Sequence, residues 1–238
     1  RLMLLILFGI VYNHGWGTGI PASFDEIRYA SVLGRIGISW FFAALIVWYL
    51  AERTQWLLAG ILLVGYWLLL AFVSIGHYGG GDYSQTGALN VWFDQMFLPG
   101  ITYQNNPLDP EGILSNVPSI VNALAGVFVG RMMKQNMADP KSLLIKLLSI
   151  GVICVALGYA WGLVFPINKV LWTSSFVLVT VGYSALLLAI FYGLIDVLHW
   201  TLWAKFFAVI GMNSIIVYLG TSIIDWTYIS SSLLGGVA

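Results

Sequence analysis

Long apolar runs separated by short polar stretches dominate this 238-residue chain. A helix needs about 20 mostly apolar residues to cross the hydrocarbon core of a bilayer. The candidate spans cover residues 2–12, 28–50, 55–76, 113–133, 143–164, 171–195 and 203–222. None of these runs shows the alternation that is typical of outer-membrane barrel strands. Because backbone groups in lipid must be hydrogen-bonded within their own segment, we predict an all-α, polytopic transmembrane helical bundle of about seven spans.

Composition narrows the classes of function. Hydrophobic residues make up 60% of the chain and charged residues 8%, whereas a soluble domain carries about 25% charged residues. We therefore expect membrane lipid to surround the protein. Ten basic residues balance ten acidic ones, so nothing indicates a nucleic-acid partner. Cys154 is the only cysteine and lies within an apolar run, which predicts neither an intrachain disulfide nor a metal site.

The chain shows no soluble domain and no internal repeat, so we interpret residues 1–238 as a single transmembrane domain. The first apolar run is shorter than a full span, follows no initial Met, and resembles the end of a helix that begins earlier. The last residues, "SSSLLGGVA", stop without a terminating pattern. We therefore expect the sequence to be part of a longer protein.

The distribution of lysine and arginine predicts the orientation. The link 131–146, "RMMKQNMADPKSLLIK", carries four basic residues and is expected to be cytoplasmic. We favour a role as topological anchor over one as a binding site for an anionic lipid or a nucleotide. Residues 77–112 then form a long extracytoplasmic loop, and loops of this length are usually functional or disordered. The stretch "VWFDQMFLPGI" within it predicts an amphipathic segment on the membrane surface or over a cavity.

Several polar residues fall at membrane depth, where they are costly and usually face a bundle interior or a cavity. Arg35 lies about two turns into the second span, where it either extends toward solvent or lines a cavity. Asn213 and Ser214 lie in the middle of the last span, and both interhelical hydrogen bonding and ligand contact remain open for them. Asn122 has small neighbours, for which we favour a helix-packing role.

The stretch "PLDPEGIL" places two carboxylates just before the span 113–133. Pro110 suits the first position of a helix, which makes Asp109 a candidate N-cap and Glu111 a first-turn partner of the helix dipole. Capping would account for both carboxylates. However, Asn168 and Lys169 in "FPINK" are expected at the same membrane face. The alternative is a polar pocket that opens to the outside.

Histidine is the natural general base near neutral pH, and the chain has three: His14, His77 and His199. An isolated loop histidine is more often a bystander than a catalyst. The sequence shows no Ser-His-Asp order, no zinc-binding helix motif and no phosphate-binding loop. The motifs alone therefore identify no catalytic residue.

Four segments in order carry a family resemblance: "LGRIGISWFFAAL", "DPEGILSNVPSIVNALAGVFVGR", "FPINKVLWTSSFVL" and "GMNSIIVYLG". Together they resemble the heparan-α-glucosaminide N-acetyltransferase family over essentially the whole chain. The enzyme of that family moves an acetyl group from cytosolic acetyl-CoA to the terminal glucosamine of heparan sulfate across the membrane. Some bacterial relatives are described instead as N-acetylglucosamine-related transporters or as acyltransferases.

The resemblance implies a shared substrate pocket formed by Arg35, Asp109, Glu111, Asn168, Lys169, Trp172, Asn213 and Ser214. It also implies acetyl-CoA as co-substrate, no metal, an amino sugar or glycan as substrate, and a multi-pass location in a bacterial inner membrane. A homodimer is one assembly that remains open. The family's proposed histidine, in a His-x-x-Trp-x-Gly context, has no match here and is expected before residue 1, so the catalytic residue is unassigned.

In this interpretation Asp109 and Glu111 orient the sugar, and Trp172 stacks on its ring. Asn213 or Lys169 would stabilise the developing oxyanion. The alternative is an inner-membrane amino-sugar transporter or binding protein that uses the same pocket without chemistry. The lack of an internal repeat, which many transporters have, favours the enzyme.

Overall fold

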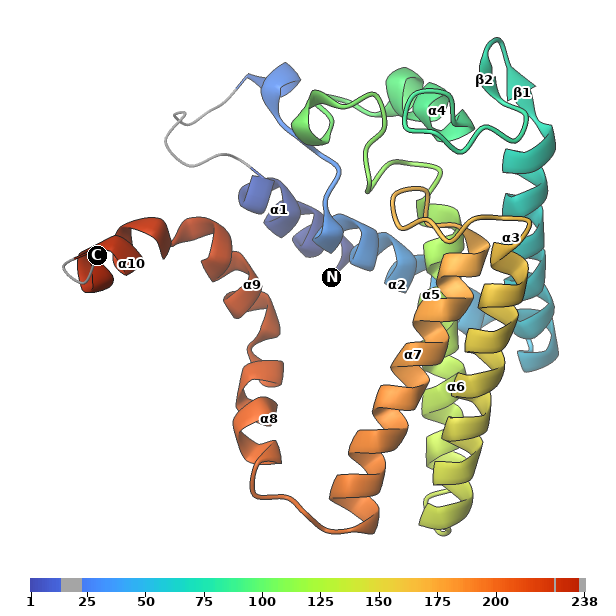
Figure 1. Cartoon of the computed structure of the whole chain (residues 1–238), viewed down its shortest axis with the longest axis vertical. Helices are drawn as coiled ribbons and strands as arrows, with labels where there is room; N and C mark the ends of the chain where they lie inside the picture. The colour runs from blue at the N-terminus through green and yellow to red at the C-terminus, as the bar shows by residue number, and fades with distance from the viewer. Residues whose placement is uncertain (14–22, 225, 236–238) are drawn as a thin grey trace.

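The protein, described by a computed structural model over residues 1–13, 23–224 and 226–235, is almost entirely helical. Figure 1 shows α3, α5, α6 and α7 standing side by side as a bundle, with α1 and α2 crossing near one end. The helices that form this part are α1 (Leu2–Asn13), α2 (Val32–Tyr49), α3 (Glu52–Phe72), α5 (Asn116–Gln135), α6 (Pro140–Gly162) and α7 (Ser174–Tyr192). A C-terminal arm, consisting of α8 (Ala204–Met212), α9 (Ser214–Ile223) and α10 (Trp226–Leu234), lies apart from the bundle (Figure 1).

Helix length and apolarity establish a multi-pass membrane protein but not seven spans. Within the described residues, four helical segments are long and apolar enough to cross a bilayer: α2, α3, α6, and α7 extended by the π-turn η3 (Gly193–Val197). A fifth span is reached if α8 and α9, which meet at a 69° bend, count as one. By these limits of length and apolarity, the predicted count of about seven is not supported.

Three of the predicted spans fall outside these limits, each for a physical reason. Helix α1 has 12 residues, which is too few to cross a bilayer. Helix α5 has 20 residues, but its apolar content is diluted by two asparagines, one serine and two cations, Arg131 and Lys134. The last predicted span is interrupted at Asn213.

Residues 73–115 fold into a layer above the ends of α3 and α5 (Figure 1). The layer contains an antiparallel hairpin of β1 (Ser74–Ile75) and β2 (Tyr78–Gly79), the helix α4 (Leu89–Phe97) and the 3-10 turn η2 (Tyr103–Asn105). The predicted amphipathic segment is α4, which buries Leu89 and Asp94 and exposes Met96 and Phe97. A second 3-10 turn, η1 (Phe24–Glu26), precedes α2, and an isolated bridge between Arg28 and Gly100 ties that segment to the layer.

Close helix packing holds the bundle together. Helices α6 and α7 meet where glycines remove side chains from the contact. A Cβ added to Gly158 would lie 2.6 Å from Val179, and one added to Gly182 would lie 2.6 Å from Val155. Small residues of this kind let helices in lipid approach closely enough for van der Waals packing. The largest buried cluster includes Leu63 of α3, Leu124 of α5 and Val177 of α7.

Candidate functional site

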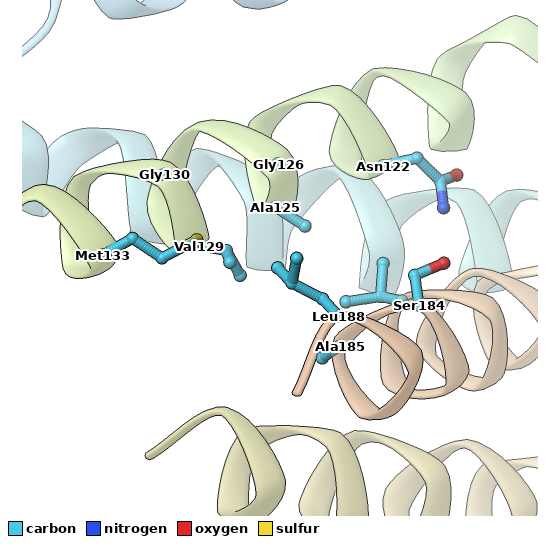
Figure 2. A pocket seen from close by; sticks show the side chains of 10 residues that line it. Asn122, Ala125, Gly126, Val129, Gly130, Met133, Ser184, Ala185 and Leu188 are labelled. Carbon is cyan, nitrogen blue, oxygen red and sulfur yellow. The ribbon is translucent and has the colours of Figure 1, made fainter. Parts of the chain in front are cut away.

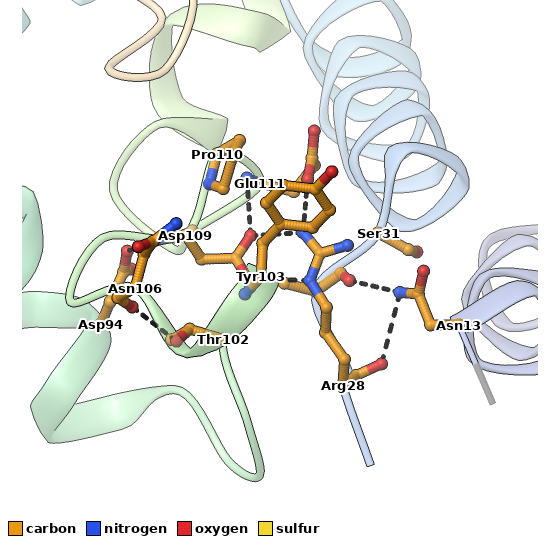
Figure 3. A network of polar contacts seen from close by, with 12 residues as sticks. Asn13, Arg28, Ser31, Asp94, Thr102, Tyr103, Asn106, Asp109, Pro110 and Glu111 are labelled. Carbon is orange, nitrogen blue, oxygen red and sulfur yellow. Dashed lines mark hydrogen bonds and ion pairs between the residues drawn. The ribbon is translucent and has the colours of Figure 1, made fainter. Parts of the chain in front are cut away.

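A network of charged side chains joins the layer to the segment before α2. Arg28 donates from Nε to Asp109 Oδ2 at 2.9 Å and from Nη2 to Asp109 Oδ1 at 2.7 Å. The same Nη2 donates to Glu111 Oε2 at 2.6 Å. Figure 3 shows the Arg28 guanidinium between the two carboxylates and beside the ring of Tyr103, whose centre lies 4.9 Å away. These ionic hydrogen bonds outweigh the burial that would lower the Arg28 pKa, so its pKa is raised.

Asp109 is a fully engaged structural carboxylate and not a helix cap. It is 0% exposed and accepts two further bonds, from the backbone N–H of Tyr103 at 2.8 Å and of Glu111 at 2.9 Å. The helix begins only at Asn116, with Ser115 at the N-cap position, so the prediction of Asp109 as N-cap is wrong. The Asp-Pro pair instead forms a β-turn in which the Gly112 N–H donates to the Asp109 backbone oxygen, and the Asx-type bond from the Glu111 N–H to Asp109 Oδ1 supports it.

Asp94 of α4 holds this turn in place, and the sequence analysis did not predict that role for Asp94. Its carboxylate accepts from the backbone N–H of Asp109 at 3.2 Å and of Ile113 at 2.9 Å. Burial, which leaves 1% of Asp94 exposed, raises its pKa to about 6 against the opposing effect of these bonds. A Cβ at Gly112 would clash with the Asp94 carboxylate, so this close approach requires glycine. The available signal was an acid on the buried face of the amphipathic α4.

Arg35 lies beneath the same turn and is 5% exposed. Its Nη2 donates to the backbone oxygen of Pro110 and to Ser115 Oγ. Its Nε and Nη1 are buried and have no hydrogen-bond partner in the structure. Unpaired buried donors on a charged group are costly. The structure thus places Arg35 in the bundle interior and rules out a side chain that extends to solvent.

Trp172 covers the Arg35 guanidinium, whose carbon lies 4.2 Å from the ring centre. A cation over an aromatic face is attracted to it, more strongly when both are shielded from water. Trp172 adopts a φ of 54°, which is uncommon for a residue other than glycine. Its Nε1 donates to Asn122 Oδ1 at 2.9 Å, and Asn122 Nδ2 donates to Thr180 Oγ1 at 3.3 Å. Asn122 therefore both orients the indole and links α5 to α7.

The structure does not join Asn168 and Lys169 to the carboxylates by hydrogen bonds or ion pairs. Asn168 Oδ1 accepts from the backbone N–H groups of Val170 at 2.8 Å and of Leu171 at 3.3 Å, so its side chain stabilises the turn before α7. Lys169 is exposed, and neither ion pair found between described residues includes it. Of the predicted site residues, Asp109 and Glu111 thus bind Arg28, while Arg35 binds the same turn at Pro110 and is covered by Trp172.

Asn213 and Ser214 are exposed at the bend of the C-terminal arm. Asn213 Nδ2 donates to the backbone oxygen of Val209 in its own helix at 2.9 Å. The arm meets the rest of the protein one turn further on, where Tyr218 stacks on Tyr12 with ring centres 4.4 Å apart. Figure 1 shows α8 and α9 separated from the α3–α7 bundle, and among the described residues no hydrogen bond joins Asn213 or Ser214 to Arg35.

Neither histidine in the described part of the chain adds a catalytic group to the cluster. His14 lies outside the described residues. His77 contacts the ring of Tyr78 in the hairpin, and His199 lies in the link between α7 and α8. Within residues 1–13, 23–224 and 226–235, no three His, Cys, Asp or Glu side chains come together as a metal site requires.

A groove of about 320 Å³ lies between α5 and α7, and Asn122 is part of its lining. Figure 2 shows Asn122, Gly126 and Gly130 of α5 facing Ser184 and Leu188 of α7 across it. Its lining is mostly small and apolar, and it contains no charged residue. The groove therefore offers helix-packing surface rather than chemical groups.

Comparison with known proteins gives this geometry a context. No protein-family model matches the chain. Among curated proteins, the chain is 30% identical to heparan-alpha-glucosaminide N-acetyltransferase from Homo sapiens, over 94% of the chain and 41% of that protein. It is 27% identical to the protein of the same name from Mus musculus, over 94% of the chain and 42% of that protein. The chain thus spans about two fifths of the length of these relatives. The resemblance seen in the four motifs is confirmed: the chain is related in sequence to the heparan-α-glucosaminide N-acetyltransferases.

Proposed function

We propose that the full-length protein transfers an acetyl group from acetyl-CoA to the amino group of a glucosamine-type sugar across the membrane. The observation that carries this proposal is the similarity, over 94% of the chain, to an enzyme named for N-acetyl transfer to a glucosaminide. A multi-pass helical bundle with a buried charged cluster fits such a reaction. Because the chain spans 41% of that relative, the activity is proposed for the whole protein.

In the proposed reaction the sugar amine attacks either the thioester carbonyl of acetyl-CoA, from which the thiolate of CoA leaves, or the carbonyl of an acetyl-histidine formed from acetyl-CoA, from which the imidazole leaves. The amine must lose a proton to a general base, which this chain leaves unassigned. The developing oxyanion needs fixed donors in a site shielded from water. The unpaired Nε and Nη1 of Arg35 are such donors, and Trp172 holds the guanidinium in place.

The remaining residues take supporting roles in the proposal. Glu111 shares one oxygen with Arg28, and its side chain keeps 12% exposure, so we assign it to the ammonium or a hydroxyl of the sugar. Asp109 positions Glu111 and Arg28 without meeting substrate, and Asn168 shapes the turn that carries Trp172. Lys169 is exposed and would contact the incoming substrate. Asn213 and Ser214 enter the site only if the C-terminal arm moves toward α2.

We propose a bacterial inner membrane as the location, with residues 131–146 cytoplasmic and 77–112 extracytoplasmic. Single cysteines at positions 85 and 139, in a Cys154→Ser background, test this orientation in intact cells. A membrane-impermeant maleimide is expected to label position 85 and to spare position 139. Labelling at position 139 without labelling at position 85 would show that the protein has the opposite orientation.

The direct test of the proposed function uses full-length protein in liposomes with isotope-labelled acetyl-CoA and glucosamine. The proposal predicts acetylated glucosamine that depends on both the protein and the donor. No turnover, together with saturable uptake of the sugar, would contradict the enzyme and favour a transporter.

A transporter remains the second candidate because of one observation, the 69° bend between α8 and α9. Interrupted membrane helices form the substrate sites of many secondary transporters. The uptake measurement above distinguishes the two functions, because a transporter moves unmodified sugar whether or not acetyl-CoA is present.

A further inference from the structure

A cavity of about 580 Å³ lies between α3, α5, α6 and α7, away from the Arg35 cluster. Its wall is apolar over most of its length, from Leu63 and Val121 at one end to the stacked rings of Trp56 and Phe128, whose centres are 3.8 Å apart. Trp56 and Ile153 line it and are each 56% exposed, so the cavity opens sideways between α3 and α6. It therefore communicates with the hydrocarbon of the bilayer.

Polar groups occur at one end of this cavity, where Glu52, Arg131 and Gln135 line it. Arg131 Nη1 donates to Gln55 Oε1 at 2.7 Å. Gln55 is 2% exposed and donates to the backbone oxygen of Leu50 at 2.7 Å, so it is fixed and in turn holds the guanidinium. Neither of the ion pairs found between described residues involves Arg131 or Glu52. One cation and one anion thus remain available at the cavity mouth.

The depth of the cavity matches one leaflet of a bilayer. Arg131 at the mouth and Val121 at the far end lie on the same helix, ten residues apart. At a rise of 1.5 Å per residue, this separation is about 15 Å. A bilayer has a hydrocarbon core of about 30 Å, so each leaflet contributes roughly half of it. Trp56 and Arg131 then lie at the level where tryptophan and basic residues are enriched in membrane proteins.

Such an apolar cavity is stable neither when filled with water nor when empty. Apolar cavities stay dry because a buried water needs two to four polar partners. An unfilled cavity loses the dispersion contacts of every atom that lines it. A flexible hydrocarbon chain that enters from the side opening satisfies the apolar wall, and its polar head remains at the charged mouth.

We propose that this cavity binds one hydrocarbon chain of a zwitterionic membrane phospholipid with a primary amine. The phosphate accepts hydrogen bonds from Arg131, and the ammonium pairs with Glu52. This charge pairing distinguishes the occupant from an anionic lipid, which Glu52 would repel. The site goes beyond the proposed function, because no group of the acetyl-transfer cluster lines it.

Photocrosslinking of full-length protein in liposomes tests the proposal. The probe is phosphatidylethanolamine with a diazirine in its acyl chain, and the adducts are located by mass spectrometry of peptides. We expect adducts at the cavity wall, near Val121, Cys154 and Val177. Cys154→Phe, which fills the cavity, is expected to abolish them. Val152→Phe, on the outer face of the same helix and 58% exposed in the wild type, is the matched control and is expected to retain them.

The headgroup is tested separately. Arg131→Gln should lower the yield of cavity adducts about fivefold, the effect of about 1 kcal/mol per basic residue at a membrane surface. Lys134 is exposed and does not line the cavity, so Lys134→Gln should leave the yield of cavity adducts unchanged. A matched phosphatidylglycerol probe should give fewer cavity adducts than phosphatidylethanolamine, and equal yields would refute the role of Glu52.

Three results would overturn the proposal. One is an adduct pattern that Cys154→Phe leaves unchanged, and another is adducts confined to lipid-facing positions such as 152. The third is loss of the cavity adducts when acetyl-CoA is added, which would assign the space to the acyl donor. Should Cys154→Phe fail to fold, Leu178→Trp fills the same cavity from α7. Thermal unfolding of each variant establishes that the comparison uses folded protein.

Discussion

The family resemblance assigns residues of two regions to one pocket: the charged cluster around Arg28, Asp109 and Arg35, and the C-terminal arm. The two regions differ in how firmly their side chains are held. In the cluster, Asp109 is 0% exposed and receives four hydrogen bonds from three segments of the chain. In the arm, Asn213 is exposed and bonds to its own helix. The cluster is thus organised before any ligand arrives, whereas the arm has to move if it is to contribute to the same site.

The largest expected difference between the two regions is in stability. Asp109→Ala leaves Arg28 without its main partner and the turn 109–112 without its acceptor. Removing one partner of a buried ion pair typically costs about 3 to 5 kcal/mol, so we expect a loss of that size in thermal or chemical unfolding. Asp25→Ala, at an exposed position of η1, is the control and should stay within about 0.5 kcal/mol of wild type. Equal losses of unfolding free energy in Asp109→Ala and Asp25→Ala would show that the cluster is not preorganised.

Asp94 should make the stability of the cluster depend on pH. Its pKa is raised to about 6 by burial, above the value of about 3.9 in an unfolded chain. Between these values the folded protein binds more protons than the unfolded one, so the free energy of unfolding falls as pH rises from 4 to 6. Two pH units correspond to a change on the order of 2 kcal/mol. Unfolding measured at both pH values should show this slope, and Asp94→Asn should remove it. A slope of unchanged size in Asp94→Asn would contradict the assignment.

Substitution of two glycines compares a tightly packed region, the turn at Gly112, with an open one, the groove at Gly126. Gly112→Ala forces the turn away from Asp94, and overpacking of this kind costs about 1 to 3 kcal/mol. Gly126→Ala adds a methyl group where nothing lies within 4 Å, so it should be neutral or stabilise α5 by up to about 1 kcal/mol. Melting temperatures of the two variants provide the comparison. A destabilised Gly126→Ala would mean that the groove in Figure 2 is occupied in the membrane.

The smallest stability effect is expected in the arm. Asn213→Leu removes one bond to Val209 within α8, and interhelical polar contacts in membranes average only about 0.6 kcal/mol. We expect a loss of no more than that in unfolding experiments. A loss above about 2 kcal/mol would show that Asn213 bridges helices, and that the arm packs more closely than the structure indicates.

The sequence predicted the parts of this architecture that depend on local pattern. The long apolar helices, the amphipathic α4 and the membrane environment follow from periodicity and composition. The number of spans did not follow, because the count included the short first run and apolar runs alone do not reveal the bend at Asn213.

The site could be predicted only in part, because its contacts connect distant positions. Arg28 bonds to Asp109 across 81 positions, and no local pattern indicates that pairing. Asp109 was mistaken for a helix cap because Asp-Pro is compatible with both a cap and a turn, and only the fold distinguishes them. Arg35 was identified correctly as unusual, since a cation inside an apolar run signals a cost that the fold must offset.

Turnover by an Arg35 variant tests the central claim most directly, that the Arg35 cluster is the site of acetyl transfer. The measurement is acetyl-CoA-dependent acetylation of glucosamine by full-length protein in liposomes, for the wild type, Arg35→Gln and the exposed control Arg53→Gln. If Arg35 stabilises the developing oxyanion, Arg35→Gln should lower kcat by about 100-fold, while Arg53→Gln retains wild-type turnover. A folded Arg35→Gln protein with unchanged kcat would contradict the account.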